Sequence, residues 1–456
     1  MEKPSLPKGT RDFGPSIMSK RQFIFDTIRT IFQKFGFLPL ETPAMENLTT
    51  LTGKYGDEGD QLLFKVLNSG DYLKGVDSAK LETRNSKQVT QDISEKGLRY
   101  DLTVPFARYV VMNRHEITFP FKRYQMQPVW RADRPQKGRY REFYQCDVDV
   151  VGTHSLICEA EIIMIILEAM QNLGVNDFTV KINHRGVLNG IAEAIGVSGK
   201  ESDLFVAIDK LEKIGEEKVR EELSGKDFSK DQLDKLFSIL SINANNDKKL
   251  SSLSEMIAKA SSGQKGLSDL NEVFQYLKHY EVSDSQVEFD ISLARGLSYY
   301  TGCIFEVKIN NVAIGSVSGG GRYDNLTGTF GDKDNLSGVG ISFGVDRIYD
   351  AMEELKLFPA DTQASSSVLV CHFDEESRNY GMMVLAKLRK AEIASEIYPD
   401  ISKMKKQLDY ANKKMIGHAV VIGADEINSG ELTLKNMKSG EQEKLPLKTI
   451  IQKLKS

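Results

Sequence analysis

Apolar and polar positions alternate along the first 175 residues in a way that predicts several helices and strands. Apolar residues between positions 24 and 35 recur on one helix face, and Gly36 supplies a C-terminal stop. Two prolines interrupt the apolar segment 37–43, which favours a strand at a sheet edge or at an interface. Residues 98–151 combine strand formers with arginine, whereas residues 159–173 have the spacing of a helix.

The second half of the chain changes character twice. From about Gly186 to Lys265, heptad-like runs predict a separate, mainly helical insertion. Strand character then returns between glycine-rich turns, and a small polar linker is followed by two more apolar runs with helical stretches between them. These segments are the strands 287–291, 304–309 and 338–343, the linker 360–367, and the runs 368–371 and 419–422. The last two runs predict a small α/β domain.

Composition places the chain among globular proteins: 456 residues, 40% hydrophobic and 27% charged, with room for about three domains. The longest apolar run, Ile162–Leu167, is too short to cross a bilayer, so we expect no membrane segment. No signal or transit peptide is visible. The four cysteines form no CxxC pair, which argues against a zinc site and a disulfide framework and favours a cytoplasmic location.

The charge is unevenly divided. The net charge is −4, but residues 366–456 carry 15 basic and 12 acidic side chains, so the excess of acidic residues lies before them. A basic appendage on an acidic body is typical of a module that binds a polyanion, although an ordinary solvated surface gives the same pattern.

Between Arg114 and Arg141, eight basic residues and several aromatic ones accompany only two acidic ones. The segment from Arg131 to Phe143 predicts a hairpin whose loop carries Lys137 and Arg139. Guanidinium groups suit phosphate because their planar fork donates hydrogen bonds in pairs. A solvated basic hairpin is the alternative interpretation.

Two pairs of polar residues have a spacing that would put them on one face of a strand. Gln145 and Asp149 form one pair, and Asp101 and Thr103 form the other. A carboxylate beside an amide or a hydroxyl could receive an ammonium group or another polar ligand. A solvent-facing strand edge remains the alternative for Gln145 and Asp149, and the pair of Asp101 and Thr103 would not by itself indicate a site.

Glycines cluster in residues 318–324 and 338–347, where they could let the backbone approach a ligand or could serve strand packing. Neither cluster is a GxGxxG fingerprint, and GxxxxGK[ST] and HExxH are absent, which disfavours Rossmann, P-loop and zinc-protease sites. Tyr299 and Tyr300 follow Arg295 at a turn into a strand and could form a site wall or a piece of core.

Together these segments resemble the histidyl-tRNA synthetase family of class II aminoacyl-tRNA synthetases along nearly the whole chain. The matching motifs are Lys8–Asp12, Glu41–Pro43 (motif 1), Leu98–Arg108 with Arg131–Asp149 (the histidine loop and motif 2), Arg295–Gly302 (the histidine-specific peptide) and Gly340–Arg347 (motif 3). The resemblance implies ATP-dependent activation of L-histidine and its transfer to the terminal ribose of histidine tRNA, with Mg²⁺ accompanying ATP. A homodimer is expected as well.

The resemblance also implies residue roles. Arg131 and Arg295 would be catalytic and would bracket the α-phosphate, while Arg347 and Phe143 would cover the two faces of adenine. The implied ATP-binding residues are Arg131, Asp133, Arg139, Phe143 and Arg347. The implied histidine-binding residues are Asp101, Thr103, Arg131, Gln145, Asp149, Arg295, Tyr299 and Tyr300. Ser298 stands where the family usually carries Asp, a departure that could alter a supporting hydrogen bond.

The implied fold is an α+β catalytic core with an antiparallel sheet and flanking helices, a helical insertion domain, and a C-terminal α/β anticodon-binding domain. The expected bounds are 1–185 and 266–359 for the core, 186–265 for the insertion, 360–367 for the linker and 368–456 for the anticodon-binding domain. Its implied tRNA-binding residues are Lys403, Lys405, Lys406, Lys413 and Lys414. The alternatives are a non-catalytic paralogue with the same fold and, more remotely, a nucleotide-binding oxidoreductase.

Overall fold

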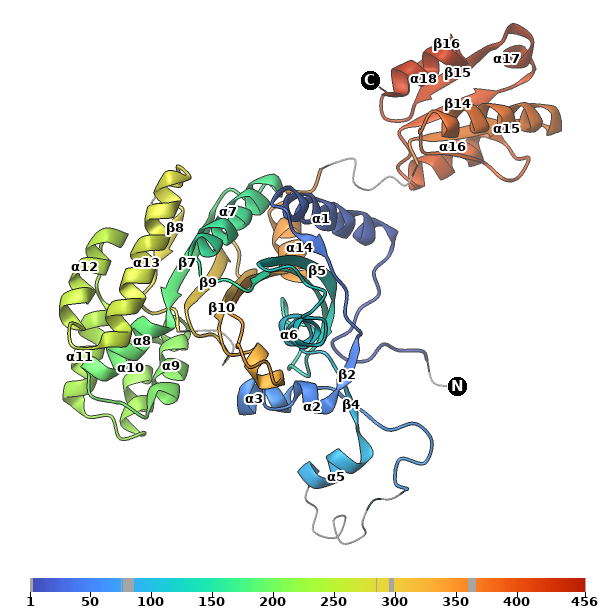
Figure 1. Cartoon of the computed structure of the whole chain (residues 1–456). Coiled ribbons are helices and arrows are strands. Elements are labelled where there is room, and N and C mark those ends of the chain that lie inside the picture. The colour runs from blue at the N-terminus through green and yellow to red at the C-terminus, as the bar shows by residue number, and fades with distance from the viewer. Residues whose placement is uncertain are drawn as a thin grey trace. The chain divides into compact units, whose positions relative to one another are not determined.

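The computed structural model describes residues 3–74, 76, 86–283, 285–294, 299–359 and 366–455. The chain forms two compact units, one made mostly of residues 24–357 and the other mostly of the residues after 357. Each unit is built around its own sheet, and Figure 1 shows both.

An eight-stranded sheet forms the centre of the larger unit, in the order β1-β5-β6-β11-β10-β9-β7-β8. Its strands are β1 (Leu38–Pro39), β5 (Phe121–Trp130), β6 (Glu142–Val151), β7 (Phe178–His184), β8 (Val287–Phe289), β9 (Cys303–Ile309), β10 (Ser318–Tyr323) and β11 (Gly338–Gly344). Neighbours are antiparallel except for β1 with β5 and β7 with β8 at the two edges. The proline-broken segment 37–43 therefore does provide an edge strand.

Helices cover the apolar face of this sheet. The second half of α1 (Pro15–Lys34) packs through Phe32, whose ring lies 5.7 Å from Tyr124 and 6.0 Å from Phe343. Helices α7 (Ile157–Asn172) and α14 (Val345–Glu354) also contact the central strands. The shorter elements are α2 (Leu48–Leu51), α3 (Gly56–Gln61), α5 (Ser86–Ile93), α6 (Thr103–Met112), η1 (Thr327–Phe330), and a small sheet of β2 (Met45–Asn47), β4 (Lys96–Leu98) and β3 (Lys65–Val66).

The glycine-rich segment from Ser318 is a strand, although its composition indicates a turn. β10 pairs with β9 and β11 along its length. At Gly320 an added Cβ would lie 2.1 Å from the carbonyl oxygen of Gly340 on β11, so the close approach of the two backbones requires glycine.

Six helices follow β7 and gather beside β7 and β8 (Figure 1). They are α8 (Arg185–Ala194), α9 (Glu201–Asp209), α10 (Leu211–Ser224), α11 (Lys230–Leu240), α12 (Asn246–Met256) and α13 (Ser261–His279). Helices α8 and α13 can pack closely because glycines lie at their contact. An added Cβ at Gly190 would lie only 2.6 Å from the Cα of Gly263. The expected insertion boundary at Lys265 falls inside α13, which runs on to His279.

The C-terminal unit contains a five-stranded sheet in the order β13-β12-β14-β15-β16. Its elements are β12 (Val368–His372), α15 (Glu375–Lys390), β13 (Ser395–Ile397), α16 (Met404–Lys413), β14 (His418–Ile422), α17 (Ala424–Ser429), β15 (Glu431–Asn436), β16 (Gln442–Pro446) and α18 (Leu447–Lys455). Along β12, Val368 and Val370 join a cluster with α15 and α18, whereas Leu369 and Cys371 join a cluster with α16. Helix α16 therefore lies on the opposite face of the sheet from α15 and α18.

Candidate active site

The strand β6 separates polar from apolar side chains. Cys146, Val148 and Val150 alternate with the polar series of Gln145, Asp147 and Asp149. Because side chains point alternately to the two faces of a strand, the polar series shares one face. The register places Gly340 and Ser342 of β11 opposite Asp149 and Asp147 on that face. The polar series is nonetheless buried, so each member must find partners within the protein.

Two glycines make room for side chains on this polar face. An added Cβ at Gly340 would lie 2.1 Å from Oδ1 of Asp149. At Gly321, an added Cβ would lie 2.9 Å from the ring of Tyr300. The glycine clusters therefore serve close packing here. Without a side chain at Gly340 and Gly321, Asp149 and Tyr300 can pack directly against the backbone.

Asp149 is held by two residues that the sequence analysis did not single out. Tyr323 donates its hydroxyl to Oδ1 at 2.7 Å, and Nη2 of Arg123 lies 2.8 Å from Oδ2 as an ion pair without hydrogen-bond alignment. Burial raises the pKa of Asp149, whereas Arg123 and Tyr323 oppose that shift. Arg123 is the partner of Asp149 across β5 and β6, so knowledge of the hairpin register would have revealed it.

Asp101 lies at the start of helix α6 rather than on a strand. Its Oδ1 accepts the backbone N–H of Val104 at 3.1 Å and the hydroxyl of Tyr55 at 3.0 Å, while its Oδ2 accepts the hydroxyl of Tyr299 at 3.0 Å. Burial raises the pKa of Asp101 despite these donors. Thr103 is the first residue of α6, so the expected same-face strand pair is wrong, because the chain turns into a helix here.

A cluster of tyrosines connects Asp101 with Asp149, because Tyr299 donates to Asp101 and Tyr323 donates to Asp149. The rings of Tyr299 and Tyr300 meet edge to face at 4.9 Å, and Tyr299 also meets Tyr323 at 6.1 Å. Burial raises the pKa of both Tyr299 and Tyr300, so their hydroxyls remain protonated donors. Asp101 and Asp149 thus lie on either side of one aromatic cluster.

Arg131 leaves the end of β5 and turns toward aromatic rings. Its Nε donates to the carbonyl oxygen of Tyr100 at 3.0 Å, and its guanidinium carbon lies 4.2 Å from the centre of the Tyr100 ring and 5.2 Å from that of Phe143. In the loop beyond it, Arg139 lies 3.8 Å from Asp133. The structure therefore brings the two predicted site residues Arg131 and Phe143 together.

Arg347 joins helix α14 to the hairpin loop. Its Nε donates to the carbonyl oxygen of Gly138 at 2.7 Å, and its Nη1 donates to that of Ser316 at 2.6 Å. The N-terminal segment also holds the hairpin: Arg11, which the sequence analysis did not single out, pairs with Asp346 and covers the ring of Tyr140 at 3.3 Å. The hairpin is thus anchored from two sides.

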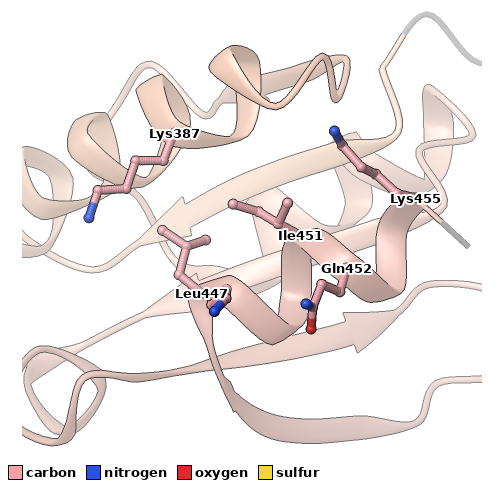
Figure 2. Close-up of a pocket in the computed structure, with 6 residues that line it drawn as sticks. Lys387, Leu447, Ile451, Gln452 and Lys455 are labelled. Carbon is pink, nitrogen blue, oxygen red and sulfur yellow. The ribbon is translucent and has the colours of Figure 1, made fainter.

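The basic run of the C-terminal unit falls on and around helix α16. Lys403, Lys405, Lys406 and Lys413 are exposed, whereas Lys414 pairs with Glu396 at 2.8 Å. On the opposite face of the sheet, α15 and α18 border a groove of about 480 Å³ that is lined by Leu447, Ile451, Gln452 and the lysines Lys387, Lys448 and Lys455 (Figure 2). The exposed lysines of α16 therefore lie on the other face of the sheet from this groove.

Two negative findings apply to the described residues alone. No group of three or more histidine, cysteine, aspartate or glutamate side chains among them could hold a metal ion. No helix among them is long and apolar enough to span a membrane. The predicted site residue Arg295, and Ser298 beside it, lie outside the described residues.

Comparison with known proteins places this geometry in a family. Residues 71–348 match the family described as histidyl-tRNA synthetase, and residues 366–456 match an anticodon binding domain. A histidine–tRNA ligase of Cytophaga hutchinsonii is 58% identical over 454 residues, covering 100% of both chains. The crystal structure of histidyl-tRNA synthetase from Nostoc sp. PCC 7120 superimposes with a TM-score of 0.85 at 31% identity, covering 100% of this chain and 99% of that one.

A Bacillus halodurans structure described as an ATP phosphoribosyltransferase regulatory subunit/histidyl-tRNA synthetase has a TM-score of 0.72 at 22% identity. It covers 92% of this chain and 99% of that one, and at this identity it shows the fold alone.

The fold and the matched domains define the protein as a class II aminoacyl-tRNA synthetase, an enzyme of the ligase class that uses ATP. The chain belongs to the histidyl-tRNA synthetase family, whose members join histidine to tRNA. The predicted fold class and family are confirmed. The oxidoreductase alternative is wrong, and the full-length match to a ligase argues against a non-catalytic paralogue.

Proposed function

We propose that the polar face of the large sheet, with the tyrosine cluster beside it, binds histidine and carries out its activation by ATP. The observation that carries this proposal is that the buried carboxylates Asp101 and Asp149 share one aromatic cluster: Tyr299 donates to Asp101, Tyr323 donates to Asp149, and the two rings meet. Histidine has two polar ends, an α-ammonium group and an imidazole ring, and the site offers one carboxylate for each.

The ammonium group would be received by Asp101, Thr103 and Gln145. Oε1 of Gln145 is buried without a hydrogen-bond donor, while its Nε2 donates to the hydroxyl of Ser342. A buried acceptor without a donor is costly, so an ammonium N–H at this position would gain a strong, charge-assisted hydrogen bond.

The imidazole ring would be read by Asp149 at one nitrogen and by Tyr300 at the other, with Tyr299 supporting the phenol. Oδ2 of Asp149 touches Arg123 but lacks an aligned donor, so it can accept an imidazole N–H. The protonated Tyr300 hydroxyl can donate to the second nitrogen. An apolar side chain of similar size would leave both groups unpaired, which gives strong discrimination.

ATP would bind along the hairpin. Phe143 would stack on adenine with Arg347 on the other face, and Asp133 and Arg139 would line the loop beside the nucleotide. Arg131 and Arg295 would hold the α-phosphate. A histidine carboxylate oxygen attacks the α-phosphorus and pyrophosphate leaves. The arginines stabilise the charge that develops on the α-phosphate. The histidine carboxylate is itself the nucleophile, so no protein nucleophile is required.

Transfer follows from the adenylate. A hydroxyl of the terminal ribose of tRNA attacks the histidyl carbonyl carbon, and the bond to AMP breaks. We propose that Mg²⁺ arrives with ATP, because the ion typically keeps water and phosphate ligands and takes only one or two protein carboxylates.

Beyond the active site, we propose that the exposed lysines Lys403, Lys405, Lys406 and Lys413 contact tRNA phosphates, with Lys414 contributing positive charge from its pair with Glu396. The helices between β7 and β8 would lean on the acceptor stem. The exposed edge strand β1, with Leu38 59% exposed, would form part of a homodimer interface. Four free cysteines suit a cytoplasmic enzyme.

The proposed function is tested by ATP–pyrophosphate exchange with the purified protein and each standard amino acid in turn. Exchange that depends on histidine alone is expected. Silence with every amino acid, in protein shown to be folded, would contradict the proposal. Exchange with a different amino acid would contradict the roles given to Asp149 and Tyr300.

A further inference from the structure

The polar series of β6 contains one carboxylate that the roles above leave unused. Asp147 is 2% exposed and lies between Gln145 and Asp149 on the same face. Ser342 is its cross-strand partner on β11, and Oδ1 of Asp147 is buried without a donor. Arg123 is fully buried nearby, yet its 2.8 Å ion pair is with Asp149.

A second orphan acceptor lies directly across from Asp147. Gln125 is the cross-strand partner of Asp147 on β5, and its Oε1 is also buried without a donor. Exchanging the oxygen and nitrogen of the Gln125 amide would not give Oε1 a donor, because the present position of Nε2 is fixed by its acceptors. Its Nε2 donates to Oγ1 of Thr42 at 2.8 Å and to Oε1 of Gln127 at 2.5 Å. That Gln127 oxygen is fixed as an acceptor by the Thr42 backbone N–H at 3.2 Å and by Arg99 Nη1 at 3.1 Å.

Two buried acceptors on directly paired residues therefore face a common lack of a donor, and one proton between them would satisfy both. We propose that, on the acid side of neutrality, Asp147 is an uncharged carboxylic acid, that it donates its proton to Oε1 of Gln125, and that it thereby leaves the charge of Arg123 to Asp149. Asp147 is then a positioning residue: it acts through Arg123 on the carboxylate that reads imidazole. This inference rests on the proposed function only for its effect on histidine.

Electrostatics agrees with the hydrogen-bond argument. Burial, the largest cause, raises the pKa of Asp147 to about 7, and the neighbouring Asp149 adds to the rise while Arg123 opposes it. The charged or titratable groups around Asp147 are Arg123, Arg99, Asp149, Asp101 and Tyr300. A single fully buried arginine between two carboxylates favours one charged and one protonated carboxyl group.

The proposal predicts a pH effect on histidine binding. As the pH rises through about 7, Asp147 loses its proton. Gln125 then loses its donor, and two anions compete for Arg123. Asp149 is held less firmly, so the KM for histidine rises. In Asp147→Asn the amide keeps the shape of the protonated acid and can still donate to Gln125, but it cannot ionise.

The first experiment compares the KM for histidine of wild type and Asp147→Asn in pyrophosphate exchange between about pH 6 and about pH 9. The ligand's own imidazole titrates near 6.5 in both assays, so the ratio of the two KM values isolates the protein. We expect a ratio within about threefold of one at low pH, because the variant mimics the neutral acid. The wild-type KM should then rise relative to the variant above about pH 7. The proposal would be overturned if the KM values of the wild type and Asp147→Asn changed in parallel with pH. It would also be overturned if Asp147→Asn bound histidine at low pH as weakly as Asp147→Ala, which cannot donate to Gln125.

The second experiment observes the proton directly. Infrared spectra of the wild type at about pH 6 should contain the carbonyl band of a buried protonated carboxylic acid, which disappears near about pH 9 and is missing from Asp147→Asn at every pH. The proposal would be overturned if the wild type showed no carbonyl band that is missing from Asp147→Asn. This measurement requires no catalysis, so it distinguishes a failure of this inference from a failure of the proposed histidine activation.

Discussion

The backbone of Gly340 passes so close beneath Asp149 that a Cβ there would lie 2.1 Å from the carboxylate oxygen. The carboxylate proposed to read histidine and a glycine of the motif 3 segment, which are far apart in sequence, are thus fitted to each other.

Gly340→Ala should therefore displace Asp149 from its place beside Tyr323 and Arg123. We expect kcat/KM for histidine to fall on the order of 100-fold, since a displacement of about 1 Å in a site has effects of that size. Steady-state pyrophosphate exchange measures it. Gly417→Ala is the matched control, because the nearest atom to its added Cβ is 3.9 Å away. Equal activity of both variants would contradict the packing argument.

Asp149→Asn should raise the KM for histidine by at least about tenfold, because the amide loses a charge-assisted acceptor at the imidazole. The KM for ATP should change little, since the proposed adenine contacts are two other residues, Phe143 and Arg347. Thermal denaturation should show that the variant remains folded. An unchanged histidine affinity would mean that another residue reads the ring.

Arg295→Ala should raise the activation free energy of adenylate formation by about 2 to 4 kcal/mol, and so lower kcat, because it removes a charge that stabilises the α-phosphate in the transition state. Single-turnover adenylate formation separates this effect from tRNA transfer. Activation at the wild-type rate would remove Arg295 from the catalytic role that the family motif implies.

Charge reversal of Lys403, Lys405, Lys406 and Lys413 should weaken tRNA binding and reduce its salt dependence, while leaving pyrophosphate exchange unchanged. Filter binding at several salt concentrations measures the first effect. Lys387→Glu with Lys455→Glu is the control, because both lysines lie at the groove on the other face of the same sheet (Figure 2). Equal weakening by the control would point to a general charge effect.

The stability of the fold should depend on pH through Asp147. An unfolded aspartate titrates near 3.9, whereas the folded pKa is raised to about 7. The protonated form is therefore favoured by folding, and this contribution is lost as the pH rises through the folded value. Relative to Asp147→Asn, the wild type should lose about 1.4 kcal/mol per pH unit between about pH 4 and about pH 7, and should lose nothing further above that range, because the carboxyl group is then ionised in both states. Urea denaturation at several pH values measures the difference, and a constant difference would contradict the assignment.

Much of the local structure was predictable because it depends on short-range patterns. The amphipathic spacing before Gly36 and the prolines of segment 37–43 gave helix α1 and an edge strand. Period-two alternation put Gln145 and Asp149 on one face of β6. The motifs in their order were sufficient to name the family. The polar pair at Asp101 was misplaced on a strand because the turn into α6 leaves no clear local signal.

The tertiary structure decided which residues are partners across the sheet. Gly320 belongs to a strand because two backbones approach closely there, although glycine alone suggests a turn. Arg123 becomes the counter-ion of Asp149, and Asp147 becomes the partner of Gln125, only through the register of β5 on β6. The sequence by itself determined the family, the elements and the candidate residues. Burial and register, which depend on contacts distant in the chain, decided their charges and partners.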